Sequence, residues 1–539
     1  MSTTPMATEK HPPAASEGAF APLREKVFAV LWIATVLGNV GSFMRDIASA
    51  WIVTELTTNP AAVAAVQAAA TLPVFLFAIP AGVLSDILDR RRFLIAVQCA
   101  LACVSAMLLA LAHTGTLSVA SLVALTFAGG VGAALMGPTW QSIVPELVPR
   151  RQLKAAVGLN SLGVNIARAI GPALGGLLLA AFGAAFTYGV DLISYACVIA
   201  ALWWWRRPAA AQNDLSEHFL GAFRAGLRYA RASRELHVVL VRAVGYFLFA
   251  SAMWALMPLV VRQLLGGSAG FYGLMLGAVG VGAIGGALAL PRLRQRLSAD
   301  GLMGLSAAVT AAVMLAMVAQ PPQAAALLLA LVLGGGWIVA LTTLSSVVQA
   351  ILPNWVRGRA LAVYLTVFNG AMAAGSLGWG LVARGIGLPM TLAASAAGML
   401  AVALWMRRLP LPTGEANLDA AHHWPEPAAV APGSHDRGPV LVQVSYRIRP
   451  ADRPAFLKAL HPVALARRRD GAYAWGVCEH TDDPQQIIEW FFVESWAEHL
   501  RQHRRVSHHD ADLQQELLQW HSGPDRPLVR HFLALHPPG

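Results

Sequence analysis

QSIVPELVPRRQLK at residues 141–154 is repeated as QAILPNWVRGRALA at residues 349–362. The matching positions keep one offset of 208 residues (141 to 349), and they include Gln141 with Gln349 and Pro145 with Pro353. Each stretch joins two long apolar runs, so it belongs to a larger unit that the chain carries twice. The alternative is a coincidence between two loops of similar composition.

Twelve apolar runs of membrane-spanning length occupy most of the chain before residue 407. About 20 apolar residues cross a bilayer as a helix, and only helices or closed barrels pair all their backbone groups in lipid. Barrel strands alternate polar and apolar residues, which these runs do not, so helices are predicted. The runs are 27–53, 61–84, 93–113, 117–143, 153–182, 186–205, 238–261, 270–290, 301–318, 324–351, 359–383 and 389–406.

The composition is not that of a soluble protein. Only 13% of the residues are charged and 56% are hydrophobic, with a mean hydropathy of +0.55, whereas a soluble domain carries about 25% charged residues. The net charge of +11 comes entirely from residues 1–406, with 25 basic and 13 acidic residues, against 15 and 16 in residues 407–539. A bilayer, and not a nucleic acid, explains a basic excess in the apolar part.

Loop charges predict the orientation of these helices. One set of alternate loops holds 21 basic residues, whereas the opposite loops hold only Arg262 and Arg384. Because basic loops stay in the cytoplasm, both termini are predicted on the cytoplasmic side of the inner membrane. The first run is too long, and begins too far from the N-terminus, for a cleaved signal peptide.

The two copies lie six runs apart, an even number, so they share one orientation. Two parallel six-helix halves are the architecture of major facilitator transporters, whose substrate site lies between the halves. We therefore predict an all-α membrane protein of twelve transmembrane helices, followed by a small α+β domain. The predicted parts are a disordered N-terminus (1–23), a first half (24–207), a cytoplasmic linker (208–236), a second half (237–406), a linker (407–438) and a cytoplasmic domain (439–539).

The stretch GVLSDILDRRRFL at residues 82–94 resembles the loop between helices 2 and 3 of the major facilitator superfamily. Gly82, Asp86, Arg90 and Arg91 match the pattern of that loop, while Asp89 replaces its usual glycine. These departures resemble the branch that contains enterobactin exporters and transmembrane secretion effectors. The resemblance covers residues 24–406 and indicates a branch of transporters, not a substrate.

The resemblance implies a role for Asp86 in gating. In the family, the carboxylate of this loop braces helix 2 against helix 11 and favours the state closed to the cytoplasm. Such a carboxylate can accept hydrogen bonds from the exposed N–H groups of a helix N-terminus. For Arg90 and Arg91 the alternative is a role in topology alone.

A second stretch, IARAIGPALGG at residues 166–176, resembles the helix 5 motif of antiporters. Small residues let helices approach closely, and proline bends a helix, so helix 5 is a candidate rocking surface. Ordinary close packing is the alternative. The matching residues are Gly171, Pro172, Gly175 and Gly176.

Ionisable side chains at membrane depth are costly, so each is a functional candidate. Asp46 in helix 1 and Arg168 in helix 5 are predicted to pair in the transport cavity, directly or through water. The pair either exchanges protons during transport or is a permanent structural tie. Asp191 in helix 6 and Arg242 in helix 7 lie nearer the ends of their runs, where snorkelling to the interface explains them equally well.

No cofactor or nucleotide site is predicted in the membrane part. GVGAIG at residues 280–285 fits a dinucleotide-binding glycine pattern, but it lies inside an apolar helix with no strand before it. No Walker loop is present, so protons are a better candidate than ATP for the energy source. The arginine that the family carries in helix 4 is absent, because Phe127 stands three residues before Gly130.

The tail from residue 439 is predicted to fold as a soluble domain. The predicted elements are a strand at 440–448, a helix at 451–468, strands at 472–480 and 486–494, helices within 495–520, and a strand at 528–535. This β-α-β-β-α-β order is typical of a ferredoxin-like sandwich. It resembles the dimeric-barrel domains related to antibiotic-biosynthesis monooxygenases. No pairing of a nucleophile with a base is evident in the tail, so a docking or dimerisation module is expected rather than an enzyme.

Two histidines in the tail have a spacing that can bind a metal. His499 and His503 are four residues apart on a predicted helix, and thus share a face. No cysteine or repeated carboxylate pattern completes a site nearby, so we interpret this surface as a solvated polar face and predict no metal.

The function expected from these patterns is secondary active export. The partners are the lipid bilayer, a small lipophilic molecule and protons, with no nucleic acid, and transport proceeds by alternating access. The alternative is an exporter fused to a domain that binds or modifies the exported molecule. A membrane-anchored regulator that no longer transports is a third class.

Overall fold

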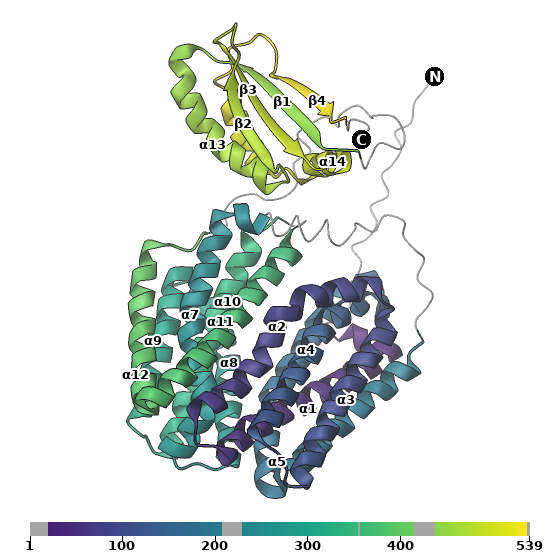
Figure 1. Ribbon diagram of the computed structural model, residues 1–539, viewed down its shortest axis with the longest axis vertical. Helices are drawn as coiled ribbons and strands as arrows, with labels where there is room; N and C mark the ends of the chain where they lie inside the picture. The colour runs from purple at the N-terminus through teal and green to yellow at the C-terminus, as the bar shows by residue number, and fades with distance from the viewer. Residues whose placement is uncertain (1–19, 207–228, 354–355, 414–436, 536–539) are drawn as a thin grey trace, which may run out of the picture. The chain divides into compact units, whose positions relative to one another are not determined.

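The computed structural model describes residues 20–206, 229–353, 356–413 and 437–535 (Figure 1). The N-terminus predicted to be disordered lies almost entirely outside these ranges, as do most residues of both predicted linkers. Contacts divide the chain into two units. The first comprises residues 1–52, 80–209 and 268–277, and the second comprises 53–79, 210–267 and 278–539.

Eleven helices in the described ranges are long and apolar enough to cross a membrane, which confirms the prediction of a helical membrane protein. In the first half of the sequence they are α1 (Lys26–Leu56), α2 (Pro60–Ile87), α3 (Arg90–His113), α4 (Val119–Leu147) and α5 (Leu153–Trp204). In the second half they are α7 (Arg234–Leu259), α8 (Ala269–Arg294), α9 (Ala299–Val318), α10 (Gln323–Ala350), α11 (Arg357–Ile386) and α12 (Leu388–Trp405).

Helix α5 contains two of the predicted runs in one element of 52 residues. A straight helix of this length would span about 78 Å, more than twice the hydrocarbon thickness of about 30 Å. The backbone leaves the helical conformation at Gly183, where φ is 79° and ψ is 178°. Leu159 and Leu202, near opposite ends of α5, belong to one apolar cluster with Phe28 and Leu94. The chain therefore reverses its direction near Gly183.

Indole hydrogen bonds link the helices of the first unit. Trp32 of α1 donates to the backbone carbonyl of Leu159 at 2.9 Å. Trp140 of α4 donates to Oδ1 of Asn160 at 2.7 Å. Lipid tails are as apolar as leucine, so helices in a bilayer gain little from hydrophobic burial against each other. Directional bonds and close packing of small residues therefore hold this unit together.

In the second unit, helix α7 is buried along most of its length. Trp379 of α11 donates to the carbonyl of Leu248, and Ser395 of α12 donates to that of Phe249, both at 2.8 Å. A Cβ added at Gly375 of α11 would lie 2.5 Å from the same Leu248 oxygen. The backbones of α11 and α7 can approach this closely only because residue 375 has no side chain.

The C-terminal domain contains a four-stranded antiparallel sheet with the order β2-β3-β1-β4. One face of the sheet packs on helices through Val444, Ile487 and Phe456. Burial alternates along β1 and β3, as expected for strands with one covered face. The elements are β1 (Val440–Arg447), α13 (Arg453–Arg469), β2 (Ala474–Glu479), β3 (Gln486–Val493), α14 (Trp496–Arg505), α15 (His508–Leu518) and β4 (Leu528–Leu533).

Replacing Gly183 by alanine is expected to destabilise the protein, because its backbone conformation is open essentially to glycine alone. The strain is about 1–3 kcal/mol, so the melting temperature of the detergent-purified protein should fall by a few degrees. Gly189→Ala is the matched control, since an added Cβ there meets only Leu109, at 4.0 Å. Equal melting temperatures for the two variants would contradict the prediction.

Candidate functional site

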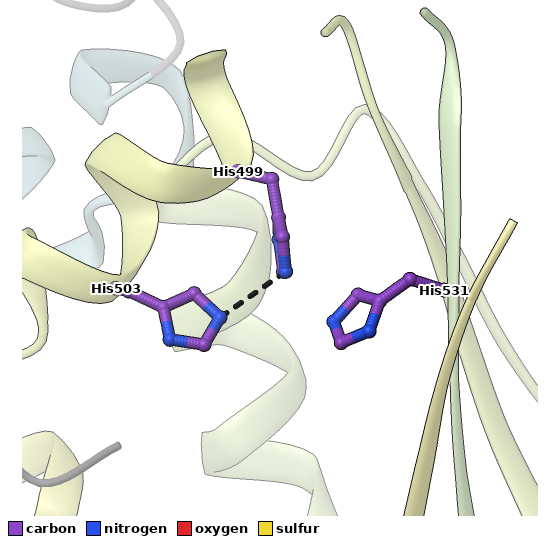
Figure 2. Close-up of side chains that lie close together, drawn as sticks. All are labelled: His499, His503 and His531. Carbon is purple, nitrogen blue, oxygen red and sulfur yellow. Dashed lines mark hydrogen bonds between the residues drawn. The ribbon is translucent and has the colours of Figure 1, made fainter. Parts of the chain in front are cut away.

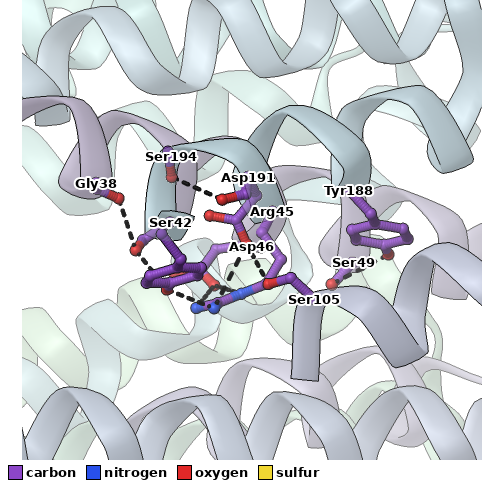
Figure 3. A network of polar contacts seen from close by, with 10 residues as sticks. Gly38, Ser42, Arg45, Asp46, Ser49, Ser105, Tyr188, Asp191 and Ser194 are labelled. Carbon is purple, nitrogen blue, oxygen red and sulfur yellow. Dashed lines mark hydrogen bonds and ion pairs between the residues drawn. The ribbon is translucent and has the colours of Figure 1, made fainter. Parts of the chain in front are cut away.

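A cluster of polar side chains surrounds Arg45 of α1 in the first unit (Figure 3). Arg45 is 6% exposed. Its Nη2 donates to Oδ1 of Asp46 at 3.0 Å, and its Nη1 donates to the hydroxyl of Tyr195 at 2.9 Å. Nη1 also lies 3.7 Å from Oδ2 of Asp191. One buried cation thus stands between two carboxylates.

Asp191, in the second part of α5, is fully buried. Its Oδ2 accepts a hydrogen bond from Ser105 of α3 at 2.6 Å. Its Oδ1 has no hydrogen-bond partner among the described residues. A buried carboxylate oxygen without a partner is costly, because it has lost its hydration.

Two glycines lie against the cluster. A Cβ at Gly41 of α1 would lie 2.2 Å from Oγ of Ser194 and 2.8 Å from Oδ1 of Asp191, so a side chain there would push α1 away from α5. A Cβ at Gly129 of α4 would lie 3.4 Å from the guanidinium carbon of Arg45. This is an ordinary van der Waals distance, so the Arg45 side chain packs against α4 at Gly129, and only Gly41 is required to be glycine by the cluster.

The two acids of the cluster differ in their access to solvent. The side chain of Asp46 is 43% exposed, while that of Asp191 is completely enclosed. With both carboxylates ionised, the three charged groups carry one net negative charge. An uncompensated charge is expensive at membrane depth. The cluster is therefore balanced when it holds one proton in addition to Arg45.

The structure pairs Asp46 with its neighbour Arg45 and not directly with Arg168. Arg168 is exposed, and no ion pair within the described ranges joins it to Asp46. A pairing of these two residues through water stays a prediction. Adjacent residues point in different directions on a helix, but the long side chain of Arg45 bends back far enough to reach Asp46. The ionisable character of Arg45 at membrane depth was the signal in the sequence that could have identified it.

Arg242 lies on α7 in the second unit. It pairs with Asp300 of α9 and donates to the carbonyl of Met406 at 2.9 Å. These residues line a cavity of about 650 Å³ together with Tyr246 and Met399. Arg242 is therefore partnered inside the protein, at the wall of a cavity.

The predicted gating loop is described only in part. Gly82 and Asp86 lie in α2, but their side chains fall outside the described part of the structure, so the proposed brace is untested. Arg90 donates to Glu146 of α4 at 2.8 Å, and Arg91 donates to the carbonyl of Leu202 at 2.9 Å. Both arginines therefore tie the start of α3 to its neighbours, in addition to any effect on topology.

The glycines of the helix 5 motif are contact points with two other helices of the first unit. An added Cβ would lie 2.7 Å from Phe43 at Gly171 and 2.8 Å from Met44 at Gly175, both on α1. At Gly176 it would lie 2.6 Å from the Cα of Gly273, on α8. Pro172 is also buried, and its carbonyl lies 2.8 Å from a Cβ added at Gly273.

The family model of the transmembrane secretion effectors matches residues 17–538. The chain belongs to this family. Because the effector family consists of major facilitator transporters, the predicted resemblance is confirmed for the membrane part, as is a transporter rather than an enzyme. The match also runs through the C-terminal domain, whose resemblance to dimeric-barrel domains remains a prediction.

Three relatives illustrate the range of the effector's similarities. The staphyloferrin A transporter of Staphylococcus aureus is 22% identical over 52% of this chain and 70% of its own length. The multidrug efflux pump Tap of Mycolicibacterium fortuitum is 27% identical over 70% of this chain and 95% of its own. The enterobactin exporter EntS of Escherichia coli is 29% identical over 42% of this chain, and the match spans about half the length of EntS, 53%.

A solved structure shares the fold of the membrane part. The crystal structure of a bacterial homologue of the human lysosomal transporter Spinster, in an inward-facing and unoccupied conformation, aligns with a TM-score of 0.55. The alignment covers 72% of this chain and 96% of that chain, at 15% identity. At this identity the comparison concerns the fold alone.

Removing Arg45 is expected to destabilise the effector strongly. Arg45→Ala leaves Asp191 buried without its cation, a change worth about 3–5 kcal/mol. Adding Asp191→Asn should restore part of the loss, so the two substitutions are not additive in thermal unfolding of the purified protein. Arg168→Ala is the control and should have little effect, because Arg168 is exposed. Additive effects of the first two substitutions would show that Arg45 and Asp191 do not interact.

Proposed function

We propose that this protein is an inner-membrane exporter that moves a small lipophilic molecule out of the cell by alternating access, in exchange for protons. The observation that carries the proposal is the buried Arg45 between Asp46 and Asp191. Membership of the effector family supports membrane transport. The names of two relatives, a multidrug efflux pump and an enterobactin exporter, support the outward direction.

Proton exchange would begin at Asp46, the more exposed acid. In the ionised form Asp46 holds Nη2 of Arg45 at 3.0 Å. A proton on Asp46 removes this attraction, and the guanidinium is then free to close the 3.7 Å separation from Asp191. Because Arg45 also donates to Tyr195 and lies against α4, its movement would alter the packing of α1 on two neighbouring helices. The protonation state is thereby coupled to helix packing.

Twelve membrane crossings are part of the proposal. The reversal at Gly183 supports two crossings within α5, which adds one to the eleven apolar helices. Basic loops on alternate sides support cytoplasmic positions for both termini. Reporter fusions at the two ends test this orientation, and opposite locations of the two reporters would refute it.

Alternating access would require contacts at the outer helix ends to open. In the proposed orientation Gly176 of α5 and Gly273 of α8 lie toward the outer side, in backbone contact within the first unit. Within the second unit, Gly380 of α11 packs in the same way on Ala64 of α2, 2.4 Å from an added Cβ. Contacts between small residues are closely fitted but carry no strong bonds, so they suit a surface that separates and closes again.

Aromatic side chains support a lipophilic substrate. In the second unit Trp337 of α10 contacts Phe247 and Trp254 of α7, with ring centroids 5.2 and 4.9 Å apart, and Phe247 contacts Phe368 of α11 at 4.5 Å. Trp254, Trp337 and Phe368 are only partly buried. Partly exposed aromatic faces offer apolar contact area to a bound molecule.

The C-terminal domain is proposed to be a ferredoxin-like module that supports self-association. Its strand order and the positions of its helices are those expected for such a sandwich. The sheet face opposite the helices carries Leu441, Trp490, Phe492 and Phe532, and all four are partly or fully exposed. An apolar sheet face in water is a typical contact surface between protein molecules.

Export should be lost in Asp46→Asn, because the asparagine imitates a permanently protonated acid and cannot exchange a proton. Proton-driven transport of dye or siderophore substrates into inverted vesicles measures this, with a substrate chosen by screening in a pump-deficient strain. Asp89→Asn is the control, since Asp89 caps α3 through the N–H of Arg92 and asparagine caps a helix equally well. Undiminished proton-dependent transport by Asp46→Asn would remove Asp46 from the mechanism.

Valine at Gly176 is expected to separate the ends of α5 and α8. Ala269 is buried in the native packing, against Gly176. An Ala269→Cys variant is made in a background without other cysteines. Its cysteine should react faster with a membrane-impermeant thiol reagent added outside when residue 176 is valine than when it is glycine. Gly158→Val on the same helix is the control, because an added Cβ there meets no atom within 4 Å. Equal labelling rates in the two backgrounds would contradict a role for this contact in closure.

A further inference from the structure

Three histidines converge inside the C-terminal domain, independently of the transport proposal (Figure 2). His499 and His503 are one turn apart on α14, and His531 lies on β4. One ring nitrogen from each residue lies within 4.8 Å of the other two. The Nε2 atoms of His499 and His503 are 3.1 Å apart. The sequence interpretation of a solvated polar face is therefore wrong for His499, which is 2% exposed.

The local structure explains why these rings meet. Residues four apart on a helix share a face, which places His499 above His503. Side chains alternate along β4, and His531 lies on the same side as Val529, which packs in the domain core. Antiparallel pairing with β1 places His531 opposite Val442. The sheet therefore presents one imidazole to the two on the helix.

The cluster leaves nitrogen atoms without protein partners. Nε2 of His531 has no hydrogen-bond partner within the described ranges. Nδ1 of His499 has none either, but the nitrogen of His499 that meets His503 is Nε2. Unpartnered buried nitrogens are unfavourable, since each has lost hydrogen bonds to water. Three kinds of partner can interact with such a nitrogen: a water molecule, a proton or a metal ion.

A small cavity lies at the meeting point. Its volume is about 30 Å³, and apolar side chains of Val442, Val444, Phe491, Val506 and Val529 form most of its lining. That space is enough for one ion with one water molecule, but not for an organic molecule. An apolar surround strengthens the bond between a metal and its ligands by excluding competing water.

The charges around the cavity permit a cation. Arg467 also lines the cavity, but its charge is balanced by Glu489, whose Oε1 lies 3.6 Å from Nε of Arg467.

We propose that His499, His503 and His531 bind a zinc ion. Three imidazoles are a known zinc ligand set, with the fourth tetrahedral position open to water or another ligand. Two nitrogens at zinc-bonding distance of about 2.0–2.1 Å from a tetrahedral ion lie about 3.3 Å apart, close to the 3.1 Å between His499 and His503. Rotation about the soft terminal torsion of His531 brings in the third ligand.

A bound ion would connect α14 to β4 directly. β4 is an edge strand that pairs only with β1 in the described sheet, so it has fewer backbone bonds than β1 or β3. Zinc would thereby stabilise the outer strand of the domain, since metal-binding energy adds to folding energy. The fourth position is left to the one water molecule for which the cavity has room.

The test uses the full-length protein purified in detergent with a tag that contains no histidine. After removal of metals by a chelator, the protein is dialysed against buffered zinc, and bound zinc is measured by mass spectrometry. One zinc ion per chain is expected in the unmodified protein. His531→Ala should weaken binding by at least about 100-fold, since even residues that only support a ligand contribute about 10- to 100-fold.

Controls separate a defined site from general histidine binding and from misfolding. His508→Ala removes an exposed histidine close to the site and should leave zinc binding unchanged. His503→Gln keeps a polar side chain of similar size and should also lose zinc, while circular dichroism reports that the fold is retained. Cobalt substitution should give the visible absorption of a four-coordinate nitrogen site. Equal zinc binding by the unmodified protein, His531→Ala and His503→Gln would overturn the proposal.

Discussion

The guanidinium of Arg45 is the interaction on which the polar interior of the first unit depends. It is buried in an apolar environment, where an unpaired charge is strongly unfavourable. Two carboxylates and a tyrosine hydroxyl gather around it from α1 and α5, and Ser105 of α3 holds one of the carboxylates. Three helices thereby share one electrostatic centre. A change in the charge of any one of these groups therefore changes the interactions of all three helices.

Close approach of backbones is the second constraint. Gly41 brings α1 close to the second part of α5, where Asp191 lies, so the Arg45 cluster can form between them. Without Gly41 these helices would stand apart, and Asp191 would lose its cation. Gly171 and Gly175 bring α1 close to the first part of α5, before the reversal at Gly183, while Gly176 forms the contact with α8. Packing and electrostatics in this unit are parts of one arrangement.

A different interaction stabilises the C-terminal domain. Water surrounds its sheet, so an apolar core with alternating strand burial holds it together. The family match runs to residue 538, which makes this domain part of the effector rather than an accidental extension. Its histidine cluster and its exposed apolar sheet face are separate features on separate sides of the sheet. Regulation or assembly of the transporter through this domain is therefore open to direct experiment.

The sequence by itself determined that this protein is a helical membrane transporter of its family. The lengths of the apolar runs, the charges of the loops and the internal repeat can all be recognised in the sequence itself. They reflect which segments lie in lipid and which in water, so no contact between distant residues is needed to interpret them. Asp191 and the helix 5 glycines were identified in the same way, because a charge or a glycine motif in an apolar run is conspicuous.

Only the tertiary structure decided which groups meet. The partner of Asp46 depended on how far the Arg45 side chain bends, and the third histidine depended on the pairing of β4 with β1. The sequence already divided α5 into two runs, 153–182 and 186–205, and the structure adds that the backbone leaves the helical conformation between them, at Gly183. Such outcomes arise from side-chain reach and from strand pairing across distant parts of the chain, and neither leaves a periodic trace in the sequence.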